Sequence, residues 1–171
     1  MAGPGVTIRD EGPSDAGAIR SLVAAAFRDA PHASGTEAQI VDRLRAAGAL
    51  TLSLVAESQG AILGHAAASP VAVGGASGWC AIGPLAVLPG HQSRGIGSAL
   101  RRATLGRLRA QGAAGAVLVD DPGFYGRFGF AADPGIGVPG IPAEYVLVLP
   151  FGASPAQGPV RHHPAFGLDE G

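Results

Sequence analysis

A strand, a glycine-containing turn and a helix follow one another near the middle of the chain, and this unit constrains the fold more than any other feature. The apolar run at residues 79–89 predicts the strand, and the sequence HQSRGIGSAL leads into a helical stretch that ends near Gly112. Glycine is unfavourable at a helix start unless the backbone must approach another group closely. Because a helix start also presents unpaired N–H groups and the positive end of the helix dipole, the unit predicts an α/β protein with an anion-binding turn.

The remaining elements follow from hydrophobic periodicity and turn residues. Ser14 or Asp15 is the expected N-cap of the first helix, SQG is an expected hairpin turn, and PGFYGRFGF begins as a helical turn that stops at Gly129. The order β-α-α-β-β-β-α-β-α-β-β indicates one α/β domain with a mixed sheet at residues 1–151. A Pro/Gly-rich segment at 152–171 is expected to pack on it without regular structure or to be partly flexible. Further strands are predicted at 6–11, 50–57, 61–73, 114–121 and 143–151, and further helices at 16–28 and 36–48.

Composition narrows the class of protein. Hydrophobic residues make up 47% and charged residues 15% of the chain, which excludes a disordered protein. The net charge of −1 argues against a nucleic-acid partner held by bulk attraction. No apolar run approaches the roughly 18 residues of a membrane span, the N-terminus lacks a secretory pattern, and the single cysteine fits a reducing compartment. We therefore expect a cytoplasmic protein with no membrane partner.

The glycine turn is compatible with a pyrophosphate seat, but not with either of two familiar nucleotide motifs. A P-loop needs a lysine, and this chain has none, whereas the dinucleotide fingerprint would need a glycine where Leu100 stands. The seat would comprise Gln92, Ser93, Arg94, Gly95, Ile96 and Gly97, with the Ser98 hydroxyl added. The alternative is a plain strand-to-helix turn whose glycines reflect a GC-rich genome, since all twelve basic residues are arginine and asparagine is absent.

The segment PLAVLPGHQSRGIGSAL resembles the acyl-CoA-binding segment of the GNAT superfamily of N-acetyltransferases, whose signature is [R/Q]-x-x-G-x-[G/A]. Gln92, Gly95 and Gly97 occupy its three defined positions. The stretches TEAQIVDRLR, LSLVAE, GH…SPV, GPLAVLP, FYGRFGF and GPVRHHPAF follow one another as in a subfamily of predicted bacterial N-acetyltransferases. This resemblance spans most of residues 6–168 and implies the GNAT fold, a mixed central sheet splayed between its fourth and fifth strands with flanking helices.

The resemblance also implies that acetyl-CoA is the cosubstrate and that its pantetheine arm pairs with exposed strand backbone. We expect Gly83-Pro84 to open the sheet, although Pro84 could instead be an ordinary edge-strand residue. Leu85, Ala86 and Val87 would then pair with the pantetheine, and a backbone N–H there would polarise the thioester carbonyl. The implied function is direct transfer of the acetyl group to a primary amine of an unidentified small-molecule or peptide acceptor.

Two residues are candidates for the catalytic proton transfers. Tyr125 occupies the tyrosine position of the family pattern in YGRFGF, where a protonated phenol can give its proton to the departing thiolate. The alternative is a packed tyrosine that supports the cosubstrate, and Phe124 replaces a second tyrosine found in many members. Many relatives carry a glutamate that acts as the general base on the strand before the turn, but WCAIGPLAV contains no glutamate. Glu37 resembles a subfamily position for this general base, and its alternative role is that of a helix-start glutamate.

Other residues favour structural interpretations. Cys80 lies in an apolar strand, so packing is favoured over a nucleophilic role, and no metal site is expected because the histidines lack metal-ligand spacing. We expect His162 and His163 at the surface and Arg101 and Arg102 on a solvated helix face, with one arginine as a candidate for the ribose 3′-phosphate. The missing strand glutamate leaves open a non-catalytic acyl-CoA-binding module that acts through ligand-dependent interaction. A homodimer is also open, because members of the superfamily often pair.

Overall fold

A computed structural model describes residues 5–28, 35–92, 94–120, 122–152 and 156–166, apart from the side chain of Phe124. The chain forms two compact units, one comprising Met1–Ala68 with Gly83–Thr104 and the other Ser69–Ile82 with Leu105–Gly171. Three elements begin in one unit and end in the other, namely β3 (Ala61–Val73), β4 (Ala76–Val87) and α3 (Ile96–Ala110). None of the helices within these described ranges has the length and apolar content needed to cross a membrane.

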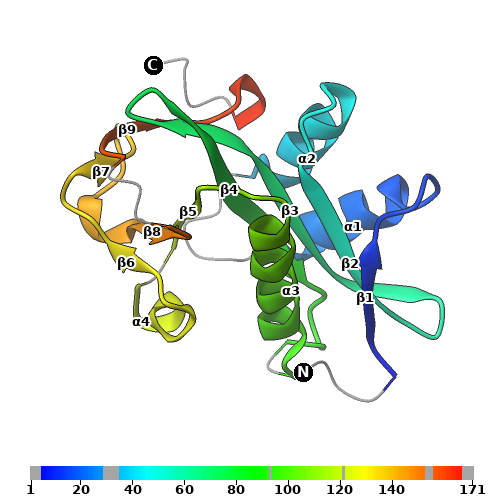
Figure 1. Ribbon diagram of the computed structural model, residues 1–171. Helices are drawn as coiled ribbons and strands as arrows, with labels where there is room; N and C mark the ends of the chain where they lie inside the picture. The colour runs from blue at the N-terminus through cyan, green and yellow to red at the C-terminus, as the bar shows by residue number, and fades with distance from the viewer. Residues whose placement is uncertain (1–4, 29–34, 93, 121, 153–155, 167–171) are drawn as a thin grey trace. The chain divides into compact units, whose positions relative to one another are not determined.

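The first unit contains an antiparallel sheet in which β1, β2 and β3 lie side by side (Figure 1). β1 (Thr7–Asp10) pairs with β2 (Leu52–Ser58), and β2 pairs with the first part of β3. The predicted SQG hairpin is confirmed, because Gln59 and Gly60 form a two-residue turn with φ angles of 50° and 81°. Positive φ at both central residues is the geometry of a type I′ turn, whose twist matches that of the strands it joins.

Helices cover both faces of this sheet. On one face α1 (Ala16–Phe27) and α2 (Glu37–Ala46) pack against the strands, and on the other α3 does so. The alternation of side chains along β2 explains the division, since Val55 faces α1 and α2 while Leu54 and Ala56 face α3. The first cluster contains Ile19, Leu22, Val23, Val41, Val55 and Ala86, and the second contains Leu54, Ala56, Ala66, Ile96 and Leu100.

The second unit contains a parallel pairing of β4 with β5 (Gly115–Val119) that joins Trp79–Ala81 to Gly115–Val117. β5 and β6 (Ala131–Ala132) each pair antiparallel with β8 (Val146–Pro150), while β7 (Ile136–Gly137) and β9 (Gly158–Arg161) form a parallel pair (Figure 1). The expected mixed sheet is therefore confirmed. The short helices of the second unit are α4 (Pro122–Tyr125) and the 3₁₀ turns Gly126–Phe128, Ala143–Tyr145 and Pro164–Phe166.

Some sequence-based expectations were wrong. Residues 152–171 were expected to lack regular structure, but β9 pairs with Ala72 and Val73 of β3, and Val160 joins the core of the second unit. Asp15 is the N-cap residue of α1, as expected, but its side chain makes no capping hydrogen bond, because its carboxylate accepts from Gly12 N at 2.6 Å and from the Arg9 guanidinium at 2.8 Å. These contacts tie the loop to β1, and they occupy the oxygens that a cap would use.

Candidate functional site

The strand segment that was expected to hold a pantetheine lies in the first unit, at the end of β4. The Gly83–Pro84 peptide bond is cis, and Gly83 has a φ of 140°, a conformation that L side chains rarely adopt. The backbone therefore departs from regular strand geometry at the predicted place. Beyond it, Ala86 is buried among the apolar residues of α1 and α2, while Leu85 and Val87 are half-buried.

The two glycines of the turn serve different purposes at the start of α3. Gly95 has a φ of 84° and accepts the first helical hydrogen bond from Ala99 N at 3.0 Å. At Gly97 a Cβ would lie 2.7 Å from Nη1 of Arg101, so this glycine makes room for the guanidinium. Gln92 donates from Nε2 to the Val87 carbonyl at 3.3 Å and so ties the turn to the end of β4. Ser93 lies outside the described residues.

This helix start has the features of an anion seat. The N–H groups of Ile96, Gly97 and Ser98 precede the first residue able to bond within the helix, and Ile96 is 3% exposed, which anchors the start in the core. Arg101 brings a positive charge to the same turn, while the adjacent Arg102 is exposed. Backbone donors, a helix dipole and a guanidinium together suit a diphosphate.

Tyr125 ends α4 in the second unit and is 5% exposed. Its ring lies 5.8 Å from that of Phe130 in an edge-on arrangement and 6.2 Å from that of Phe128. Gly129, with a φ of 92°, ends the following 3₁₀ turn where the sequence predicted a stop. The motif YGRFGF thus folds back on itself, and its two phenylalanines hold the tyrosine ring in place.

Glu37 is the first residue of α2 and is half-buried. Its carboxylate accepts a hydrogen bond from Gly35 N at 3.1 Å. This contact is the one expected of a glutamate that stabilises a helix start, because it satisfies a backbone donor next to the helix dipole. The role of Glu37 as a general base stays a prediction.

The structure also bears on the residues that were given structural interpretations. The Cys80 side chain is buried, with 6% exposure, in agreement with packing. His162 is 7% exposed, and its ring centroid lies 5.0 Å from that of Phe166 in a tilted arrangement. The expected surface position was therefore wrong, because this histidine directly follows the unforeseen strand β9. Within the described ranges no cluster of His, Cys, Asp and Glu could hold a metal ion.

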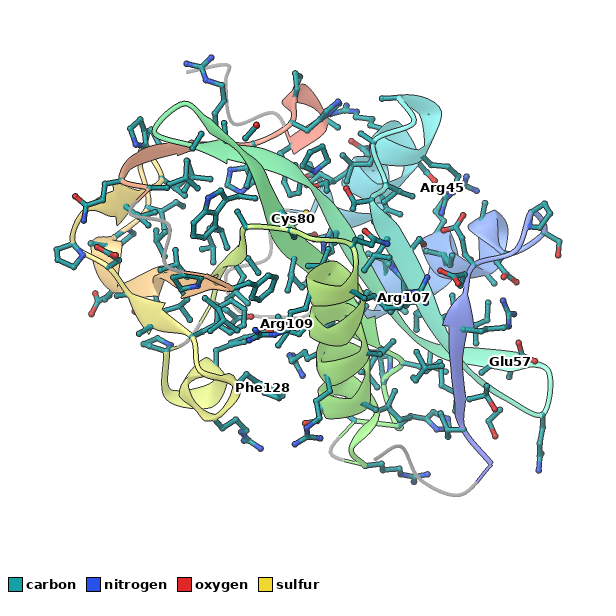
Figure 2. The ribbon with its side chains drawn as sticks, in the orientation of Figure 1. Arg45, Glu57, Cys80, Arg107, Arg109 and Phe128 are labelled. Carbon is teal, nitrogen blue, oxygen red and sulfur yellow. The ribbon has the colours of Figure 1, made fainter. Side chains whose placement is uncertain are left out.

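A buried polar chain in the first unit was missed. His65 Nε2 lies 2.8 Å from Ser53 Oγ, Ser53 donates to Glu11, and two arginine nitrogens of Arg45, near the end of α2 (Figure 2), each lie 2.9 Å from a Glu11 oxygen. His65 is 0% exposed, and burial lowers its pKa to about 4, so the ring is neutral at neutral pH. Burial opposes ionisation of Glu11, but hydrogen bonds from Arg45 and Ser53 outweigh it and lower its pKa.

The sequence contained a signal for this series of hydrogen-bonded side chains. Ser53 and His65 lie at buried positions of strands whose other buried residues are mostly alanine, leucine and valine, with Ser69 as a further buried polar residue. Polar residues at such positions need partners, and the period of two along each strand would have placed both on one face. The partner Glu11 follows β1, and only the β1–β2 pairing brings it beside Ser53, whose carbonyl accepts from Glu11 N at 2.9 Å.

Comparison with known proteins identifies relatives that match most of the chain. A model of the acetyltransferase (GNAT) family matches residues 17–130. The uncharacterized N-acetyltransferase YhbS of Escherichia coli K12 is 39% identical over 125 residues, which are 72% of each chain.

Two crystal structures resemble the chain throughout. A GNAT family acetyltransferase from Brucella melitensis in complex with acetyl-CoA is 49% identical, with a TM-score of 0.84 over 94% of this chain and 97% of that one. YhbS from Escherichia coli in complex with CoA is 33% identical, with a TM-score of 0.87 over 95% and 92%. The GNAT fold expected from the resemblance is therefore confirmed.

Proposed function

The chain belongs to the acetyltransferase (GNAT) family and is an acyltransferase, and from this premise we propose that it transfers the acetyl group of acetyl-CoA directly to a primary amine of a small-molecule or peptide acceptor. The observation that carries the proposal is the glycine turn at the start of α3, with N–H groups that precede the first intrahelical hydrogen bond and the guanidinium of Arg101. The acetyl-CoA complex of the Brucella melitensis relative supports the choice of cosubstrate. The single cysteine supports a cytoplasmic location.

In this proposal the cosubstrate follows β4 toward the helix start. The backbone of Leu85, Ala86 and Val87 pairs with the pantetheine amides, and one N–H polarises the thioester carbonyl. The pyrophosphate is held by Gln92, Ser93, Arg94, Gly95, Ile96, Gly97 and Ser98, mainly through backbone N–H groups. Arg101 lies at the same turn and adds a charged hydrogen bond to a phosphate oxygen.

The chemistry is a direct displacement without a covalent enzyme intermediate. The neutral amine attacks the thioester carbon, a C–N bond forms and the C–S bond breaks. Tyr125 gives its phenolic proton to the departing thiolate, and the phenolate takes a proton from the new amide nitrogen. An alkylammonium must first lose one proton, and Glu37 is one candidate for that step.

Calorimetry with acetyl-CoA, followed by a thiol-release assay over a panel of amines, tests the proposal. We expect saturable binding and release of one CoA thiol for each acetylated amine. Binding without transfer to any amine would favour a non-catalytic acyl-CoA-binding module. The absence of saturable binding by the folded protein would contradict both functions.

A further inference from the structure

The polar chain of Glu11, Ser53 and His65 has a direction that donor and acceptor chemistry imposes. The ionised carboxylate of Glu11 only accepts hydrogen bonds, so Ser53 must donate its single hydroxyl hydrogen to it. The Ser53 oxygen can then only accept from His65, and the ring proton of His65 therefore resides on Nε2. This leaves a lone pair on Nδ1 of His65 at the inner end of the chain.

That inner end is buried without a hydrogen-bond partner. Nδ1 of His65 contacts no donor in the part of the chain that the structure describes, and the residue is 0% exposed. Buried polar atoms without partners are rare in folded proteins and usually indicate a bound water, an ion or a functional role. A proton donor that is supplied from outside the chain would complete this site.

His65 lies beside the strand that we assign to the cosubstrate. β3 and β4 are neighbours, Leu88 N donates to the Leu63 carbonyl at 2.8 Å, and a Cβ on Gly64 would lie 3.3 Å from the Ala86 carbonyl. This register brings His65 opposite Ala86, the middle residue of the pantetheine segment. The register partner of His65 in β2, Val55, also packs in one cluster with Ala86.

The outer end reaches the surface of the first unit. Glu11 and Arg45 have side chains that are 18% and 25% exposed, and Arg45 also bonds Asp42 at 3.1 Å. Glu11 and Arg45 are the charged groups that act on His65, and Asp42 in turn also binds Arg20. The side chains that α1 and β4 contribute to the cluster around Val55 are apolar, namely Ile19, Leu22, Val23 and Ala86. The polar chain of His65, Ser53 and Glu11 therefore joins the buried Nδ1 of His65 to the Glu11 carboxylate, which is in contact with water.

We propose that His65, Ser53 and Glu11 form a proton relay that carries the proton of the acceptor ammonium from the cosubstrate strand to solvent, an inference that rests on the proposed function. One bound water passes the proton to Nδ1 of His65, Nε2 gives its proton to Ser53 Oγ, and the Ser53 hydroxyl gives its own to Glu11, which releases it to water. One proton leaves for each ammonium consumed, and the ring proton of His65 must return from Nδ1 to Nε2 before the next turnover. The relay supplies the base that β4 lacks, since residues 76–87 contain no acidic side chain.

The experiment compares two acceptors in three variants. His65→Gln keeps an amide donor for Ser53 but cannot pass a proton, and Ser53→Ala breaks the relay in its middle. Thr104→Val is the matched control, because Thr104 is a buried hydroxyl that donates to the Leu100 carbonyl of its own helix. An alkylamine, which is charged at neutral pH, and hydroxylamine, which is neutral there, serve as acceptors.

We expect kcat for the alkylamine to fall on the order of 100-fold in His65→Gln and in Ser53→Ala, as for loss of a general base, and to stay unchanged in Thr104→Val. The loss should be much smaller with hydroxylamine, and calorimetry should give unchanged affinity for acetyl-CoA. Should His65→Gln fail to fold, Ser53→Ala and Glu11→Gln carry the same comparison.

Three outcomes would overturn the relay. Equal losses with both amines would indicate a structural role, unchanged turnover would exclude any role, and weakened acetyl-CoA binding would make His65 a cosubstrate contact. Failure of the proposed function can be distinguished from failure of the relay, because the unsubstituted protein would then transfer no acetyl group to any amine. The relay would be wrong in that case too.

Discussion

The hydroxyl of Tyr125 can be tested by a single substitution, because the chain contains one other tyrosine. Tyr125→Phe keeps the ring between Phe128 and Phe130, so we expect unchanged acetyl-CoA affinity and a kcat lower by roughly 10²- to 10⁴-fold, the range for one proton transfer. Tyr145 is 41% exposed, and Tyr145→Phe is the control. Steady-state thiol release gives both values. Full turnover in Tyr125→Phe would leave this tyrosine a packing role only.

Arg101 is a second residue whose role follows from its position. Its guanidinium occupies the space beside Gly97, so Arg101→Gln should weaken CoA binding by about 10-fold, the scale of one charged hydrogen bond. Added salt should reduce the difference between the two proteins, because it screens the charge. Arg107→Gln, on an exposed position further along α3, is the control in the same calorimetric titration. Equal effects of the two substitutions would reduce Arg101 to a general contribution of charge.

At the scale of the residue, the sequence indicated an unusual backbone position better than it indicated burial. Gly95 was singled out as a place where the backbone approaches another group closely; its φ is 84°, and its anion-binding role stays a prediction. The surface position expected for His162 was wrong and the partners of His65 were not foreseen, because both depend on strands that are distant in sequence. Ser53 did not stand out because its partner Glu11 is supplied by another strand.

At the scale of the element, α3 contains two glycines for which substitution should have opposite effects. Gly95→Ala forces a Cβ onto a φ of 84° and should lower the free energy of unfolding by about 1 kcal/mol. Gly106 lies inside the helix on an exposed position with open space around it, so Gly106→Ala should raise that free energy by about 0.5–1 kcal/mol. Urea denaturation measures both. The same sign for the two variants would contradict this account of the helix start.

Elements with a long periodic pattern were predicted well, whereas the shortest strands were not. β3 was predicted with its observed bounds, and the 3₁₀ turn Gly126–Phe128 stops at the predicted Gly129. β6 and β7 have two residues each, too few to show a period, and β9 exists because β3 and β7 offer it backbone partners. Their detection requires tertiary pairing, which no local window contains.

For the whole molecule, the ordered set of motifs indicated the family better than any physical pattern did. The resemblance spans residues 6–168, and the family match covers residues 17–130. Hydrophobic periodicity alone predicts an α/β protein with a mixed sheet, and proteins of that class have many unrelated functions. The turn at Gly95 and Gly97 narrowed that class to an anion binder, and the motifs around it narrowed the anion to an acyl-CoA.

The free energy of unfolding should fall as the pH becomes acidic, because His65 is buried in its neutral form. Burial lowers the pKa of this histidine to about 4 from an ordinary 6.5, so the unfolded chain takes up the proton first as pH falls. The stabilisation is complete above pH 6.5 and is lost between there and pH 4, with a total of about 3 kcal/mol. The pKa of Glu11 is lowered, because hydrogen bonds from Arg45 and Ser53 outweigh burial. Its contribution to the free energy of unfolding is therefore also lost as pH falls.

Urea denaturation across this pH range, with His65→Gln beside the unsubstituted protein, measures the effect. Glutamine does not titrate, so the variant should show a flatter dependence of unfolding free energy on pH, while Thr104→Val should keep the full slope. Parallel curves for all three proteins would mean that His65 binds a proton as readily in the folded state as in the unfolded one. That result would also weaken the relay, which requires His65 to release its proton to Ser53 rather than retain it.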